Sequence, residues 1–134
     1  MSAKTVAQQQ ITVGQKAAVE GPSADKKHVV VFEDDGDTGY FYALDMSRAD
    51  NPIVDALHIY NVTNVTDRHI PSTVQIVWSS DDLKALLLIN RYPHAAFDFS
   101  TKRGYCRTGF PPSTHTGWTQ HSHEWDDKVV EMFR

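Results

Sequence analysis

The stretch that decides the fold is Thr73-Val-Gln-Ile-Val-Trp78, followed by Ser79-Ser-Asp-Asp82 and Leu83-Lys-Ala-Leu-Leu-Leu-Ile-Asn90. Two apolar runs around a short polar tetrapeptide are typical of a β-hairpin. In the second run, alternate residues from Leu83 to Ile89 share one face, while Leu86 and Leu88 occupy the other. A strand with apolar residues on both faces is expected at the centre of a sheet, with a layer on each side.

Other segments repeat the hairpin pattern on both sides of this unit. His28–Phe32 and Tyr40–Leu44 are β-branched or aromatic runs, and their connection contains Asp35-Gly36, residues that tolerate a positive φ. The alternation of Ala95, Phe97 and Phe99 indicates a strand buried on one face. Further strands are predicted over residues 11–20, from about 55 to 62, and over 105–108.

A single helix is predicted, over Glu124–Phe133, because Trp125, Val129 and Met132 would share one face there. A helix of about ten residues is not stable alone, so we expect it to dock on the sheet that contains Leu87 and Phe97. The fold class is therefore α+β, mainly β: an antiparallel, hairpin-rich sheet packed by one C-terminal amphipathic helix. Residues 1–10 are predicted to be a disordered tail before a single globular domain, 11–134.

Composition narrows the class of protein. The chain has 134 residues, of which 40% are hydrophobic and 22% charged, as in ordinary folded domains. Its longest strongly apolar run, 85–89, is far shorter than the roughly 20 residues that cross a bilayer, so no membrane association is expected. The chain start lacks an apolar signal segment, and Cys106 has no cysteine with which to pair. These features predict a cytoplasmic protein, and none of them indicates a cofactor.

Acidic residues are concentrated in one part of the chain. Between positions 20 and 55 there are nine acids (Glu20, Asp25, Glu33, Asp34, Asp35, Asp37, Asp45, Asp50, Asp55) and three bases (Lys26, Lys27, Arg48). Local neutralisation by the basic stretch 84–107 is one interpretation. The other is an acidic contact face, centred on Glu33, Asp34, Asp35 and Asp37, that steers a basic partner protein. This second interpretation predicts a non-enzymatic protein-binding module, and the net charge of −4 makes nucleic acid an unfavourable partner.

A histidine cluster supports a different class of function. His115, His121 and His123 lie in or next to a long polar loop, with carboxylates nearby, and these are ligand types for Zn²⁺ or Fe²⁺. The alternative hypothesis is therefore a metal-dependent enzyme that uses these three histidines. Their spacing matches no closed metal motif, and the first-turn acids of the predicted helix are explained by the helix dipole.

Two further motifs are explained by structure alone. Asp35 could begin a calcium loop, but the twelfth residue counted from it is Met46, where a bidentate glutamate is required. Cys106, between Tyr105 and Arg107 in a predicted strand, is expected to be a small buried hydrophobic residue rather than a nucleophile.

Several stretches together resemble a bacterial family of small single domains of unknown function: 33–45, 55–62, 78–90, 104–107 and 123–127. The resemblance covers about residues 28 to 133. It implies a bacterial cytoplasmic protein with a shared fold, and it brings no catalytic residue. The compact, acidic, β-rich texture is also similar in style to single-domain immunity proteins that block toxins. An exposed edge strand would further favour a homodimer.

Overall fold

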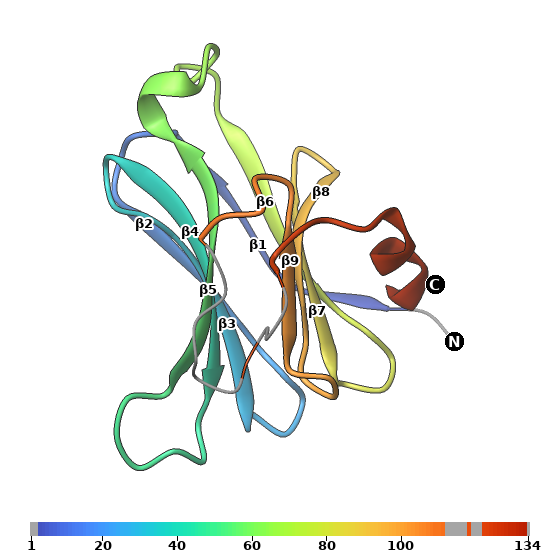
Figure 1. Cartoon of the computed structure of the whole chain (residues 1–134). Coiled ribbons are helices and arrows are strands. Elements are labelled where there is room, and N and C mark those ends of the chain that lie inside the picture. Colours follow the sequence, from blue (N-terminus) through green and yellow to red (C-terminus); the bar gives the residue numbers. More distant parts are fainter. Residues whose placement is uncertain (1–2, 112–117, 119–121, 134) are drawn as a thin grey trace.

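The computed structural model describes residues 3–111, 118 and 122–133, and within them nine strands form two antiparallel sheets (Figure 1). The first sheet has the order β1-β6-β7-β8-β9, with bounds β1 (Lys4–Ile11), β6 (Ser72–Trp78), β7 (Lys84–Ile89), β8 (Tyr92–Asp98) and β9 (Arg103–Cys106). The second has the order β2-β3-β4-β5, with bounds β2 (Ala17–Pro22), β3 (His28–Asp34), β4 (Thr38–Asp45) and β5 (Ile53–Asn61). Two short 3₁₀ helices, η1 (Val62–Asn64) and η2 (Asp127–Phe133), complete the described elements.

The two sheets pack face to face around one apolar layer. Phe41 of β4 stacks on Phe97 of β8 with ring centroids 5.1 Å apart. Trp78 lies fully inside this layer, and its indole Nε1 donates a hydrogen bond to the Gly21 carbonyl of the opposite sheet, 3.0 Å away. Cys106 is buried here, as predicted. The inward side chains of both sheets therefore form the main core, as expected for a β-sandwich.

The predicted hairpins are confirmed. β6 pairs antiparallel with β7, and β3 with β4, in the segments where the apolar runs lie. β7 is the middle strand of its sheet, with Leu87 buried on the inner side and Leu86 on the outer side. Its two apolar faces follow from this position.

The prediction of a single sheet packed by a C-terminal helix is wrong, because a second sheet lies where the helix was expected. The C-terminal helix η2 is a short 3₁₀ helix, and its buried residues Val129 and Phe133 pack beside Leu86 and Ala96 on the outer face of the first sheet. The inner residues Leu87 and Phe97, predicted as its partners, pack in the main core instead. None of the helices in the described residues is long and apolar enough to span a membrane.

The predicted disordered tail is also different in the structure. Residues 4–11 form β1, which pairs antiparallel with β6 in register from Lys4 opposite Trp78 to Ile11 opposite Ser72. Only Ile11 of this strand is buried, and Ala7 is half-buried. Backbone hydrogen bonds to β6 therefore hold this strand at the sheet edge. Such pairing needs no alternation of apolar side chains, so the sequence contains no pattern from which the strand could be predicted.

Candidate functional site

Asp34, predicted as part of the acidic contact face, is buried in the structure. Its carboxylate accepts hydrogen bonds from the Gly14 and Gly36 backbone amides, both at 2.8 Å, and from the Tyr60 hydroxyl at 2.7 Å. Burial and this contact with Asp34 raise the pKa of Tyr60. Asp34 therefore joins β3 to the turn after β1 and to β5, and it cannot meet a partner protein.

This placement gives a prediction that separates two neighbouring acids. Asp34→Asn should lower the free energy of unfolding by about 1 to 3 kcal/mol. The Asn side chain has one acceptor oxygen, and its NH₂ group cannot replace the second oxygen that now accepts from these donors. Asp37→Asn, at an exposed position in the same turn, should change it by less than about 0.5 kcal/mol. Urea unfolding of both variants measures the difference, and equal small effects would contradict the buried role of Asp34.

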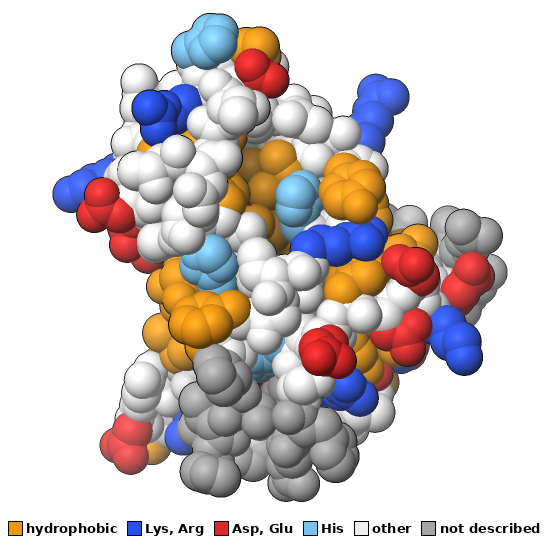
Figure 2. Space-filling view, turned by 45° about the horizontal axis from the view of Figure 1, so that its top comes forward, with side chains coloured by type: hydrophobic (Ala, Val, Ile, Leu, Met, Phe, Trp, Pro, Cys, Tyr) orange, Lys and Arg blue, Asp and Glu red, His pale blue; other side chains and the backbone are white. Residues whose placement is uncertain are grey.

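Several other acids of this region stabilise turns. Asp35 accepts hydrogen bonds from the Asp37 and Thr38 amides, Asp25 from Lys27, and Asp45 from Ser47. Glu33 and Asp37 remain exposed. On the face seen in Figure 2, acidic side chains are scattered among basic and hydrophobic ones and form no continuous patch. The acid excess of the sequence therefore arises largely from turn chemistry, and a contact face must be sought elsewhere.

The histidine cluster is not assembled as a metal site in the described part of the chain. His115 and His121 lie outside the described residues. His123 is completely buried, with Nε2 at 2.9 and 3.0 Å from the two carboxylate oxygens of Asp55, and with Nδ1 against the Pro111 carbonyl. Among the described residues no three histidine, cysteine or acidic side chains form a metal-binding group. The three-histidine site is therefore wrong in its third member, because both ring nitrogens of His123 are already occupied.

Both ring nitrogens of His123 face oxygen atoms, Nε2 those of Asp55 and Nδ1 that of the Pro111 carbonyl. A carbonyl oxygen only accepts, so Nδ1 donates to Pro111. Burial alone would lower the pKa of His123, but the hydrogen bonds to Asp55 and Pro111, together with the charge of Asp55, raise it. Gly104 makes room for this pair, because a Cβ there would lie 2.8 Å from Asp55 Oδ2. The pair thus ties β5 to the segment before η2, and its ring offers no free base.

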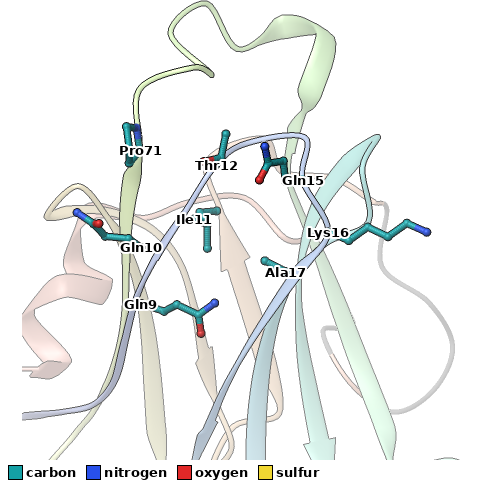
Figure 3. Close-up of a pocket in the computed structure, with 8 residues that line it drawn as sticks. All are labelled: Gln9, Gln10, Ile11, Thr12, Gln15, Lys16, Ala17 and Pro71. Atoms are coloured by element: carbon teal, nitrogen blue, oxygen red, sulfur yellow. The ribbon is translucent and has the colours of Figure 1, made fainter.

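A cleft at the β1–β2 connection was considered as a small-molecule site. Gln9, Thr12 and Gln15 are among the residues that line it (Figure 3). Their side chains do not converge on one point, and Lys16 extends away from the cleft. A ligand pocket usually has an apolar wall and a few converging polar groups. The polar side chains of this cleft do not converge, so we assign it no ligand.

The outer face of the second sheet has the composition of a contact surface. Its outward positions form three cross-strand rows: Ala18, Glu33, Tyr40 and His58; then Glu20, Val31, Tyr42 and Ala56; then Pro22, Val29, Leu44 and Ile53. We call these twelve residues the tyrosine face. Apart from Glu20, Glu33 and His58 they are apolar, whereas a solvated sheet face is normally polar. The face holds no lysine or arginine.

The centre of the tyrosine face combines aromatic area with negative charge. The Tyr40 and Tyr42 rings stack with centroids 5.8 Å apart, and the His58 ring meets Tyr40 edge-on at 5.4 Å. Burial, together with the negative charges of Glu33 and Asp35 and the neighbouring Tyr40, raises the pKa of the Tyr42 hydroxyl. Glu33 lies directly opposite Tyr40 in the β3–β4 register, so an acidic residue and the tyrosines share this part of the face.

The two outer faces of the sandwich differ in how the chain covers them. On the first sheet, Val129 and Phe133 of η2 pack on Leu86 and Ala96. Figure 1 shows η2 beside that sheet and no described helix over the tyrosine face. Among the described residues, a C-terminal helix therefore covers the outer face of the first sheet, and no helix covers that of the second.

Sequence reasoning placed Glu33 on a contact face and missed the surface around it. The signal was present, because Tyr40 and Tyr42 alternate with the core residue Phe41 and so point to the opposite side. The cross-strand neighbours could not be identified without the register of four strands. The His123–Asp55 pair, 68 positions apart, left no local signal.

Comparisons with known proteins show the family to which the chain belongs. Residues 11–134 match the family described as an uncharacterized protein conserved in bacteria (DUF2251). An uncharacterized protein of Haemophilus influenzae is 50% identical over 105 residues, which cover 78% of this chain and 64% of that relative's length. The chain thus matches less than two thirds of that relative. No solved structure matches. The chain therefore belongs to this family of uncharacterised bacterial proteins, as the sequence resemblance predicted.

Proposed function

We propose that this protein is a non-enzymatic protein-binding module, and that the tyrosine face is its contact surface for a basic partner protein. The observation that carries the proposal is the composition of this face, which is apolar, contains two tyrosines and two glutamates, and holds no cation. Tyrosine is enriched in protein interfaces because its ring contributes large apolar area and its hydroxyl a hydrogen bond.

The charge of the face favours a basic occupant over the alternatives. A second copy of the chain would bring its own Glu20 and Glu33 against the same residues, and like charges in contact are unfavourable. Nucleic acid would meet the same repulsion from its phosphates. A protein with lysine or arginine around an apolar anchor would instead neutralise the glutamates and cover the tyrosines. An inhibitor that blocks a toxin in the manner of immunity proteins is one form such a module could take.

The test compares matched variants of the immobilised protein in a lysate of the bacterium that encodes it. Tyr40→Ser with Tyr42→Ser removes the aromatic area, and Glu20→Gln with Glu33→Gln removes the charge. The control, Asp67→Asn with Glu124→Gln, removes two exposed acids outside the face and changes the net charge equally. We expect wild type and control to retain the same basic protein, and the tyrosine variant to lose it.

Kinetics with the retained protein then separate the two contributions. The glutamate variant should associate more slowly and with a flatter salt dependence than the control, because exposed charges act on the encounter rate. The tyrosine variant should dissociate faster, because short-range contacts determine the lifetime of the complex. If all variants retained the same proteins equally, or if wild type retained only copies of itself, the proposal would be refuted.

A further inference from the structure

β1 differs from every other strand of its sheet in how little of it is buried. Six of its eight residues are exposed, whereas each of the other strands of this sheet has at least three buried residues. A register shift between Thr5 and Ala7 interrupts its ladder with β6. Segments with few buried apolar contacts and solvent-exposed backbone hydrogen bonds are those that open at low free energy.

β6, the strand that pairs with β1, is packed in the main core. In β6, Val74, Ile76 and Trp78 are almost fully buried in the main core. If β1 left, β6 would keep its side-chain packing and would expose an unpaired backbone edge. Such an edge is a ready template for another extended segment.

The turn after β1 limits how much of the chain could separate from β6. Val13 is buried, and the Gly14 amide donates to Asp34 Oδ2 at 2.8 Å, so the turn is fixed to the second sheet. Figure 3 shows the chain arching at this point from β1 toward β2, with Ile11 and Thr12 at the start of the arch. Ile11 is also buried in the main core, so the segment that can detach is residues 4–10, without loss of the turn.

We propose that β1 is an exchangeable strand, and that a second copy of this chain lays its own β1 on the β6 edge. Another β1 reproduces the same ladder with the same side chains, so exchange leaves the hydrogen bonds and packing unchanged in number. The second copy is favoured over a foreign strand because its register already matches, including the Gln75 Nε2 hydrogen bond to Gln8 Oε1 at 2.9 Å. This inference does not depend on the tyrosine face.

The experiment uses two full-length single variants, Gln8→Cys and Gln75→Cys, one of which carries a mass tag. Gln8 and Gln75 are cross-strand neighbours with polar side chains, so neither substitution removes core packing. The two proteins are mixed at high concentration, incubated under mild oxidation, alkylated and separated without reductant. We expect a disulfide-linked heterodimer of tagged and untagged chains, and a larger yield when the two are refolded together. The control mixture pairs Gln8→Cys with Glu33→Cys, an exposed position on the other sheet.

A third variant makes every outcome informative. Gln8→Cys with Gln75→Cys in one chain should close an internal disulfide that fixes β1 in place. The strand-exchanged dimer that wild type forms should then be absent from size-exclusion chromatography of this variant. If this internal bond forms but the mixed single variants give no more heterodimer than the control, β1 stays on its own chain and the proposal is overturned. Failure of the internal bond to form would overturn the β1–β6 register on which the proposal depends.

Discussion

Replacing His123 with glutamine is expected to lower the free energy of unfolding by about 3 to 5 kcal/mol, because it removes the ring that contacts both oxygens of the buried Asp55 carboxylate. Asp55→Asn should cost a comparable amount for the reciprocal reason. The double variant Asp55→Asn, His123→Gln should be much more stable than the sum of the two single losses predicts, since it replaces both members of the buried pair with neutral amides. Denaturant unfolding of the four proteins completes the cycle, and strict additivity would show that the two side chains do not interact.

The same pair predicts a pH dependence of stability. The pKa of His123 is raised above its ordinary value of 6.5 in the folded protein. The pair therefore contributes fully below about pH 6.5, and the contribution is lost as the pH rises through the raised pKa. His94 acts in the opposite sense, because burial and the charge of Arg107 lower its pKa to about 4. Wild type and His123→Gln both contain His94, so its effect cancels when the two are compared. The difference in unfolding free energy between them should therefore narrow toward alkaline pH. A constant difference would contradict a charged His123.

Trp78→Ala is the second substitution with a large expected effect, a loss of about 3 to 5 kcal/mol of unfolding free energy. Trp78 is buried between the sheets, stacks on Phe99 with centroids 5.5 Å apart, and donates to the Gly21 carbonyl. A domain has a total stability of about 5 to 15 kcal/mol, so this variant should melt far below wild type.

Trp125→Ala is the matched control for this prediction. Trp125 is only half-buried and stacks on the Arg107 guanidinium, whose carbon lies 4.2 Å from the ring centre. Its loss should cost on the order of 1 kcal/mol, as expected for a partly exposed cation–π contact. Equal drops in the thermal midpoint would contradict the division between the main core and the outer cluster.

The hairpins were predictable because their information is local. The runs 28–32 and 40–44 contain β-branched and aromatic residues, and the turn between them contains an Asp-Gly pair. The run from Lys84 to Ile89 indicated a strand covered on both sides, which β7 is. In each case a single segment contains the pattern, the turn and the burial.

The features that escaped prediction depend on residues far apart in the chain. The acidic neighbours of Asp34 indicate a surface position, but its buried carboxylate accepts hydrogen bonds from Gly14 and Tyr60, 20 and 26 positions away. β1 contains Gln8, Gln9 and Gln10 and shows no apolar period, since most of its side chains are exposed and its backbone makes the pairing with β6. The predicted helix had the right apolar spacing, but the sequence could not show that a second sheet already occupied the inner face.

Site-specific photocrosslinking inside living bacteria tests whether the tyrosine face binds a basic protein. A photoreactive phenylalanine analogue replaces Tyr42 in one strain and Tyr92, an exposed tyrosine at the other sheet, in a control strain. We expect one discrete crosslinked product from position 42, a basic protein identified by mass spectrometry. This product should be absent from position 92 and weakened when Glu20 and Glu33 are changed to glutamine. No product at position 42, or the same products from both positions, would contradict the assignment of the tyrosine face as a protein-binding surface.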